Sequence, residues 1–265
     1  MNAMYEYILA GFLMFVMLVA LHSNLQSLIA NTTALMMEED YNMAESLIDM
    51  ILLSPGNPAN WSSTTPTLFG LAAQEATRTY VLDPKKVIRL DENHTDYPWI
   101  SPGELRSLLG LSSDIYLVIR IKPIFNISIQ SVSDEEYKIT VKNHKGVPLA
   151  NVNITGYYMP ESIGPNGTED STETVTGIDG SCMLEKRTGY CLVVCADLIG
   201  VKTMQTDPPY LRVKVEGNQV VPSEVPAITS INYTGGVFYG LSTDWAARYV
   251  EIDGFTYYFE LEVWR

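Results

Sequence analysis

The chain has 265 residues, with 17 basic and 31 acidic side chains and a formal net charge of −14 at pH 7. This charge excludes most nucleic-acid-binding roles, because a surface that binds phosphates has to supply a basic patch. Anionic lipid headgroups are disfavoured as ligands for the same electrostatic reason. The length is sufficient for one or two domains with hydrophobic cores of their own.

The most apolar part of the chain lies near its N-terminus, where residues 8–21 (ILAGFLMFVMLVAL) contain no polar side chain. As a helix they would span about 21 Å, less than the roughly 30 Å hydrocarbon core of a bilayer. Three interpretations remain open: a cleaved signal peptide, a membrane-spanning anchor that continues to residue 29, and a helix that later joins a bundle of identical helices. The residues expected in this membrane or filament-core segment are Glu6, Ile8, Leu9, Phe12, Leu13, Phe15, Val16, Leu18 and Leu21.

The distribution of charge predicts where the rest of the chain is located. No Lys or Arg precedes Arg78, whereas seven acidic residues do. Cytoplasmic flanks of membrane segments normally carry the positive excess, so we expect the body of the protein outside the cell. A signal peptide normally begins with a basic region, which residues 1–7 lack, and residues 20–22 make a poor cleavage site.

The helical pattern continues beyond residue 21. Neither Gly nor Pro occurs from Ser23 to Leu53, and apolar residues recur at three-, four- and seven-residue steps. This pattern predicts one helix of about 45 to 50 residues, apolar all round at first and amphipathic later. The sequence Ser54-Pro55-Gly56-Asn57-Pro58 ends it. Residues 1–55 are therefore expected to form a membrane or filament-core helix.

Residues 56–113 form a mixed connecting region, in which Pro and capping residues predict short helices at 84–90 and 102–109. From residue 114 the hydrophobic period changes to two, which indicates β-strands. The expected strands lie at 115–121, 124–129, 137–141, 152–157, 174–178, 182–185, 190–195, 210–215, 227–233, 237–239, 249–252 and 256–263. The predicted fold class is α+β: a long N-terminal helix followed by an antiparallel Ig-like β-sandwich head at residues 114–265.

Acceptor sequences for N-linked glycans are frequent in this chain. Seven of its fourteen asparagines stand two residues before Ser or Thr, and such an excess favours a glycosylated exterior. A polar asparagine in a turn is an equally good explanation of any single one. The seven predicted glycosylation sites are Asn31, Asn60, Asn93, Asn126, Asn153, Asn166 and Asn232.

Candidate residues for chemistry are few. Cys182, Cys191 and Cys195 allow at most one disulfide, whose pairing is left open, and they do not have the spacing of a metal site. The three histidines are scattered along the sequence, and none of the common hydrolase or phosphate-binding motifs occurs. The acidic runs lack the alternating spacing of a calcium loop. We therefore predict no catalytic residues, no metal, no cofactor and no enzymatic activity.

Two parts of the sequence resemble known families. The segments Gly146-Val147-Pro148-Leu149-Ala150-Asn151-Val152-Asn153-Ile154, Gly177-Ile178-Asp179-Gly180 and Tyr190-Cys191-Leu192-Val193-Val194-Cys195-Ala196 are similar to Ig-like and transthyretin-like surface modules. This resemblance covers about residues 126–205 and implies an Ig-like core there. Because such sandwiches host many activities, the resemblance implies little about function.

The N-terminal half resembles archaeal type IV pilin-like proteins. The shared features are a segment that is apolar and then amphipathic, and the sequence that follows this predicted helix, Ser54-Pro55-Gly56-Asn57-Pro58-Ala59-Asn60-Trp61. In pilins the apolar half packs in the filament core, and a Glu near mature position five helps to align neighbouring subunits. Glu6 is the fifth residue if Met1 is removed. A favourable negative charge near a helix N-terminus is an equally good explanation of Glu6. The sequence departs from the family in having no leader with a basic residue and Gly before the apolar run.

Two hypotheses for the function follow. The first is a structural subunit of an extracellular pilus-like filament, which polymerises with identical subunits through the N-terminal helix and resides in the membrane before assembly. The second is a single-span anchored surface adhesin that binds a surface or glycan ligand of unknown identity and does not polymerise. A hydrolase forms a third class, for which the sequence offers no positive indication.

Overall fold

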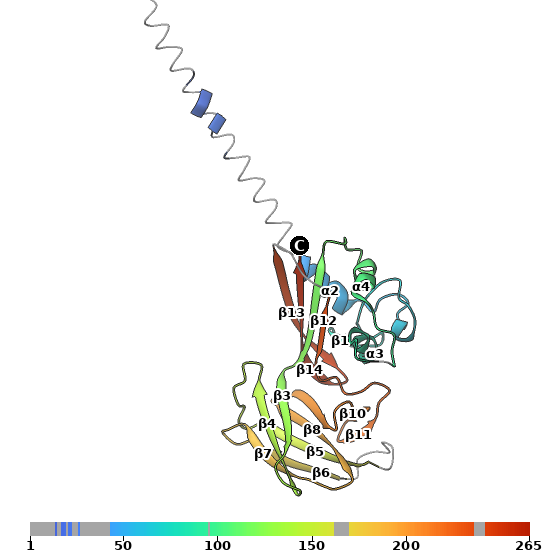
Figure 1. Cartoon of the computed structure of the whole chain (residues 1–265), viewed down its shortest axis with the longest axis vertical. Coiled ribbons are helices and arrows are strands. Elements are labelled where there is room, and N and C mark those ends of the chain that lie inside the picture. Colours follow the sequence, from blue (N-terminus) through green and yellow to red (C-terminus); the bar gives the residue numbers. More distant parts are fainter. Residues whose placement is uncertain are drawn as a thin grey trace, which may run out of the picture. The chain divides into compact units, whose positions relative to one another are not determined.

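The computed structural model describes residues 43–94, 96–161, 170–235 and 242–265, together with residues 14, 17–19, 21, 22 and 26. The chain divides into two compact units, Met1–Met43 and Ala44–Arg265. The second unit contains all the sheets (Figure 1). The predicted boundaries at residues 55 and 113 remain predictions.

The predicted α+β fold class is wrong. Among the described residues, 45% lie in strands and 16% in helices, and the strands form several sheets, so the described part of the protein is mostly β. No long N-terminal helix is shown: α2 (Met43–Leu53) is helical, as are the few described residues before it, and the rest of residues 1–42 lies outside the described part. Among the described residues, no helix is both long enough and apolar enough to cross a membrane. The helical pattern of the first 53 residues covers about one fifth of the chain, and the period-two segments decide the class.

A five-stranded sheet forms the part of the second unit that contains both α2 and the C-terminus. Its order is β1-β13-β14-β2-β12, antiparallel throughout except that β1 runs parallel to β13. Every second side chain of β14 is buried, as expected for a strand with one face on a core. The strands are β1 (Val81–Leu82), β2 (Tyr116–Pro123), β12 (Ile231–Thr234), β13 (Thr243–Ile252) and β14 (Phe255–Trp264).

A sandwich of two further sheets confirms the predicted sandwich-like β fold. A three-stranded sheet, β3-β4-β7, and a four-stranded sheet, β6-β5-β8-β9, are antiparallel throughout. Ile139, Val141, Ile154 and Val194 lie in their common core with no exposed surface. The strands are β3 (Phe125–Ser131), β4 (Glu136–Asn143), β5 (Asn153–Pro160), β6 (Asp170–Val175), β7 (Ser181–Glu185), β8 (Tyr190–Leu198) and β9 (Val201–Asp207).

The predicted short helices are confirmed between α2 and the first long strand. Asp83 caps the first of them by accepting a hydrogen bond from the backbone N–H of Lys85, and Ser101 caps the last by accepting one from Glu104. A small hairpin, β10 (Val213–Glu216) with β11 (Gln219–Pro222), completes the fold. The helices are η1 (Trp61–Ser63), α3 (Pro84–Val87), η2 (Ile88–Leu90) and α4 (Pro102–Leu108).

Two buried cations hold the irregular segment around η1. Lys86 is fully buried, and its ammonium donates to the carbonyl oxygens of Pro55 (2.9 Å) and Ala72 (3.0 Å). Arg89 is 2% exposed and donates to the carbonyl oxygens of Trp61, Thr64 and Pro98 at 2.6–2.8 Å. Both cations lie over the buried Trp61 ring, at 5.9 and 4.9 Å from its centroid. Burial lowers the pKa of both cations.

Helix α2 is fixed to the five-stranded sheet by polar contacts. Its buried face consists of Ala44, Leu47, Ile48, Ile51 and Leu52. Arg248 of β13 forms ion pairs with Glu45 and with Asp49 of the helix, the latter at 3.4 Å from Nε to Oδ1. The Tyr80 hydroxyl donates to the same Asp49 oxygen at 3.3 Å. The hydrogen bond to Glu45 is the main cause of the raised pKa of Arg248.

The second unit thus consists of two lobes. We call residues 124–207 the sandwich lobe, and residues 44–123 with 208–265 the sheet lobe. The chain passes from one to the other at Ile124, because β2 ends at Pro123 in the five-stranded sheet and β3 begins at Phe125 in the sandwich (Figure 1). Strands β12 and β14, which follow residue 207 in the chain, pair with β2 on its two sides in the five-stranded sheet. The sandwich lobe is therefore an insertion within the sheet lobe.

Candidate functional site

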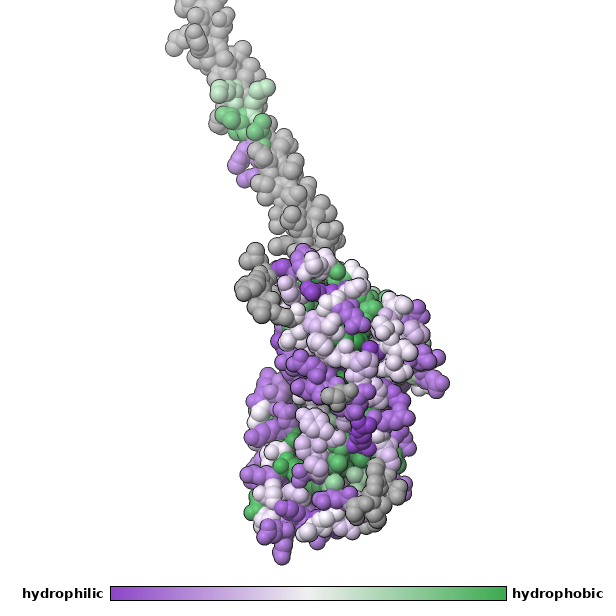
Figure 2. Space-filling model, turned by 45° about the vertical axis from the view of Figure 1, so that its right-hand side comes forward, coloured by the Kyte–Doolittle hydropathy of each residue, from purple (hydrophilic) through white to green (hydrophobic). Residues whose placement is uncertain are grey.

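The structure places five of the seven predicted glycosylation sites, and all five are exposed: Asn60, Asn93, Asn126, Asn153 and Asn232. Asn31 and Asn166 lie outside the described residues. The face of the second unit in Figure 2 is mostly hydrophilic, with small hydrophobic areas between polar ones. Glycosylation itself remains a prediction at every site.

Three of the exposed acceptor asparagines lie on strands, where the acceptor sequence has a geometric consequence. Side chains at positions i and i+2 of a strand share one face, so the Asn and the Ser or Thr point outward together while the residue between them points inward. The inward residues are Ile127, which packs against the sandwich core, Ile154, with no exposed surface, and Tyr233, 2% exposed. In the loop acceptor at Asn60, the middle residue is the buried Trp61.

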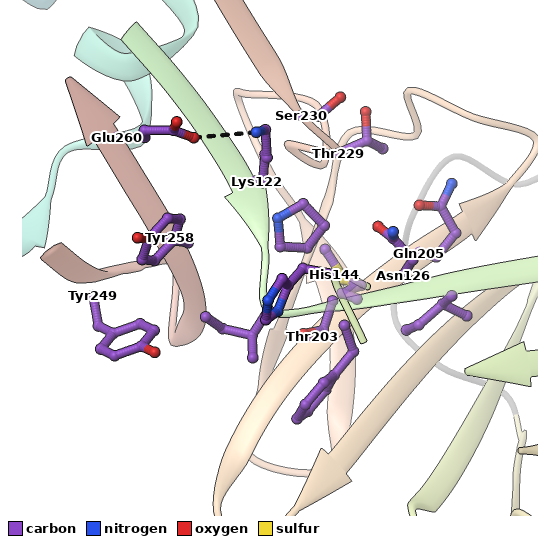
Figure 3. Close-up of a pocket in the computed structure, with 15 residues that line it drawn as sticks. Lys122, Asn126, His144, Thr203, Gln205, Thr229, Ser230, Tyr249, Tyr258 and Glu260 are labelled. Atoms are coloured by element: carbon purple, nitrogen blue, oxygen red, sulfur yellow. Dashed lines mark hydrogen bonds and ion pairs between the residues drawn. The ribbon is translucent and has the colours of Figure 1, made fainter. Parts of the chain in front are cut away.

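A groove of about 690 Å³ lies where the two lobes meet, and we call it the interlobe groove. Its volume is within the usual range of small-molecule sites, about 300–1,000 Å³. Figure 3 shows residues from both lobes around it, with Tyr249 and Tyr258 on one side of the view and Asn126 and Gln205 on the other. It is lined by Lys122, Pro123, Ile124, Phe125, Asn126, Ile127, His144, Thr203, Met204, Gln205, Thr229, Ser230, Tyr249, Tyr258 and Glu260.

The charged groups of the interlobe groove neutralise one another. Glu260 accepts hydrogen bonds from Lys122 (3.1 Å), Arg120 (3.2 Å) and the Trp245 indole (3.1 Å). Burial alone would raise the pKa of Glu260, but the donors Trp245 and Lys122 and the charge of Arg120 outweigh it, and the pKa lies below its ordinary value. This carboxylate is therefore ionised and saturated with donors at neutral pH, which makes it unsuited to take a proton from a substrate.

Aromatic and hydroxyl groups supply the other contacts that the groove can offer. The rings of Tyr249 and Tyr258 are tilted against each other with their centroids 5.6 Å apart, and Tyr249 is 67% exposed. Burial raises the pKa of Tyr258, so its hydroxyl keeps its proton at neutral pH. Thr203 is only 2% exposed, and its Oγ1 has no hydrogen-bond partner within the described part of the chain. This oxygen is itself buried, so the polar groups that the groove presents are those of its more exposed lining residues, such as Gln205 and Ser230.

A second cavity, of about 630 Å³, lies beside the four-stranded sheet and also includes an acceptor asparagine, Asn153. Its other lining residues come from β5, β6, β8 and β9, from the β10–β11 hairpin and from the turn between β13 and β14. The two aromatic residues that line this cavity, Tyr157 and Phe255, are only 5% and 4% exposed. This cavity therefore lacks the open ring faces that the interlobe groove offers.

The three cysteines are free thiols in the structure, and the possible disulfide remains a prediction. Cys182 is on β7 of the three-stranded sheet, whereas Cys191 and Cys195 are on β8 of the other sheet. The predicted strands at 182–185 and 190–195 follow each other in the sequence, but they lie in different sheets. Burial raises the pKa of all three thiols, to about 11 for Cys182. Thiols that stay protonated at neutral pH are poor nucleophiles and poor metal ligands.

Most of the predicted membrane or filament-core residues lie outside the described part of the chain. These are Glu6, Ile8, Leu9, Phe12, Leu13, Phe15 and Val16. Leu18 and Leu21 are helical, with 58% and 62% of their surface exposed. Their role in a membrane or a filament remains a prediction.

The described residues contain no group of three or more His, Cys, Asp or Glu side chains that could hold a metal ion. Comparisons with known protein families, with curated proteins and with solved structures find no match to this chain. The fold and the groove define it as a two-lobed, β-rich protein with a charge-balanced groove between its lobes. Sequence reasoning missed that groove, because its residues come from six separate stretches of the chain; among them, only Asn126 is a predicted site residue.

Proposed function

We propose that the chain is displayed on the outer surface of a cell and is a structural subunit of a pilus-like filament. Residues 44–265 would form the exposed, glycosylated body, and the apolar segment at residues 8–21 would hold the subunit in the membrane and later in the assembly. The observation that supports outside display most strongly is the outward position of all five described acceptor asparagines. A glycan is large and hydrophilic, so it can be carried only where the asparagine faces solvent.

The fixed position of α2 supports an assembled subunit. The contacts of Arg248 with Glu45 and Asp49 tie this helix to the five-stranded sheet. The order of the sheets, β3-β4-β7 against β6-β5-β8-β9, supports relating the sandwich lobe to Ig-like modules. The relation to archaeal pilin-like proteins continues to rest on the sequence segments quoted above.

Imaging of the native material tests this proposal. We expect filaments that disassemble or fail to form when Glu6→Gln is introduced, because the variant removes the charge that would align neighbouring subunits. The matched control is Glu75→Gln, which neutralises an exposed glutamate in the sheet lobe and should leave the filaments intact. Monodisperse single chains in detergent, with or without the Glu6 substitution, would rule out a filament subunit.

The interlobe groove favours a second candidate, an anchored binding module that does not polymerise. A groove of this size with open tyrosine rings and balanced charge is suited to a neutral polar ligand. The anchored module shares the outside location and the apolar segment with the filament subunit, and differs in needing no self-association. An unassembled chain whose Glu6→Gln variant behaves like the native protein would favour this candidate.

A further inference from the structure

We propose that the interlobe groove holds the glycan carried by Asn126, so that a sugar attached to the sandwich lobe packs against the tyrosines of the sheet lobe. The inference rests on the glycosylated exterior proposed above, but not on filament formation. It assigns to Asn126 a role different from that of the other acceptor sites. At Asn60, Asn93 and Asn232 a glycan would extend into solvent, whereas at Asn126 it would fill a groove of the protein.

The position of Asn126 is the first reason. It is the second residue of β3, immediately after the crossing from the sheet lobe, and it lines the groove while being exposed. Ser128 shares its outward face, and Ile127 packs on the core, so the acceptor sequence is presented in the geometry described above. A ligand covalently attached at the edge of a groove is present at a high effective concentration, which allows weak contacts to hold it there.

The chemistry of the lining is the second reason. One face of a sugar ring presents C–H groups, which pack favourably on the electron-rich face of an aromatic ring. Tyr249, 67% exposed, and its neighbour Tyr258 offer such faces. The hydroxyl groups of a sugar need hydrogen-bond partners, and the groove offers the side chains of Gln205 and Ser230.

The balance of charge is the third reason, because it argues against other ligands. Lys122 and Glu260 pair with each other at 3.1 Å, so the groove presents neither a free cation to a phosphate nor a free carboxylate to a metal ion. A neutral ligand rich in hydroxyl groups has only a small desolvation cost on entering such a site. Free saccharides share this chemistry, and the experiment below distinguishes them from the attached glycan.

Attachment itself is a transfer reaction for which the protein supplies only the acceptor. The Asn126 amide nitrogen forms a bond to the anomeric carbon of the first sugar and loses a proton. The bond from that carbon to the phosphate of a phosphate-activated glycan donor breaks, and the phosphate-bearing carrier leaves. A transferase of the cell catalyses this step before the groove is filled.

The test compares two acceptor variants of the full chain produced in its native type of host. Ser128→Ala removes the acceptor sequence of Asn126 and retains every residue of the groove. Thr234→Ala removes that of Asn232 on β12 and serves as the matched control, since Thr234 is also an exposed strand residue. Mass spectrometry of the peptides measures occupancy, and hydroxyl-radical footprinting measures the reactivity of Tyr249.

We expect Asn126 to be occupied, and Tyr249 to react several-fold faster in Ser128→Ala than in the native chain and in Thr234→Ala. A second variant, Tyr249→Ala, keeps the acceptor sequence and should speed enzymatic release of the Asn126 glycan while leaving that of the Asn232 glycan unchanged. An unoccupied Asn126, or equal reactivity of Tyr249 in all chains, would overturn the inference. Protection of Tyr249 only on adding a free saccharide would overturn it too, because the groove would then serve a separate ligand. None of these outcomes depends on whether filaments form.

Discussion

The sandwich lobe and the irregular segment at residues 54–100 bury their interiors by different means. In the sandwich lobe, strand ladders satisfy the backbone, and the core is almost entirely apolar. In the irregular segment, Lys86 and Arg89 are buried with Trp61, and together they donate to five backbone carbonyl oxygens. Buried carbonyl groups need donors, and where no neighbouring strand provides them, long cationic side chains can do so. The comparison shows why the sandwich lobe follows an alternating pattern and the irregular segment does not.

The largest effect is expected on breaking the cation contacts. Arg89→Met keeps a long apolar side chain but leaves the carbonyl oxygens of Trp61, Thr64 and Pro98 without this donor. An unsatisfied buried polar group costs roughly 1–3 kcal/mol, so we expect the free energy of unfolding to fall by about 4 kcal/mol in urea titrations. Arg78→Met, at a side chain 70% exposed, should change it by less than about 0.5 kcal/mol. A loss below about 1 kcal/mol for Arg89→Met would show that water replaces the guanidinium without cost.

A somewhat smaller effect is expected in the sandwich core. Ile139→Ala removes three carbons from a side chain with no exposed surface, and such truncations cost about 3 kcal/mol. Lys142→Ala, at an exposed position of the same strand, should change the free energy of unfolding by less than about 0.5 kcal/mol. Hydrogen exchange should rise first in strands β3 to β9 for Ile139→Ala and first in residues 54–100 for Arg89→Met. Equal increases in both regions would mean that the lobes unfold as one unit.

The sequence was informative wherever inward positions are apolar. Strands such as β4 and β14 alternate buried and partly exposed residues, and both were predicted. Strand β9 was missed because two of its buried residues are Thr203 and Thr206, which do not produce an apolar period. The predicted strand at 237–239 lies outside the described residues.

Long-range pairing was the part that the sequence could not supply. Strands β2 and β3 follow each other directly, yet they join different sheets, because β2 pairs with β14 and β12 from the end of the chain. The partner of a strand is chosen by contacts far away in the sequence, and no local pattern encodes it. The interlobe groove depends on this pairing. The outward position of the acceptor asparagines depends only on the local alternation of strand residues, so the sequence could indicate it. The groove depends on long-range pairing, so the sequence could not predict it.

An effect of intermediate size is expected where the lobes meet. Glu260→Gln weakens the charged hydrogen bonds to Lys122 and Arg120, and should lower the free energy of unfolding at neutral pH by about 1–2 kcal/mol. Because the pKa of Glu260 is lowered on folding, the unfolded chain binds the proton first as the pH falls below the ordinary value of 4.5. The contribution is therefore complete above pH 4.5 and is lost below it, so the difference between variant and native chain should shrink in acid unfolding curves. The exposed Glu135→Gln is the control, and a difference that stays constant down to pH 3 would contradict this account.

The smallest effect is a gain in stability at a turn of the sandwich lobe. Ile199 and Gly200 connect β8 to β9 in a two-residue hairpin with φ angles of 55° and 84°. Such turns favour Asn-Gly, and a β-branched residue at positive φ is strained. Since Ile199 is 95% exposed, its side chain contributes almost no burial to offset that strain. Ile199→Asn should therefore raise the free energy of unfolding by about 0.5–1 kcal/mol.

The matched control is Ile178→Asn, at a turn residue that is 97% exposed but has no positive φ, which should leave stability unchanged. Equal gains in both variants would mean that lower surface hydrophobicity, and not relief of backbone strain, is the cause.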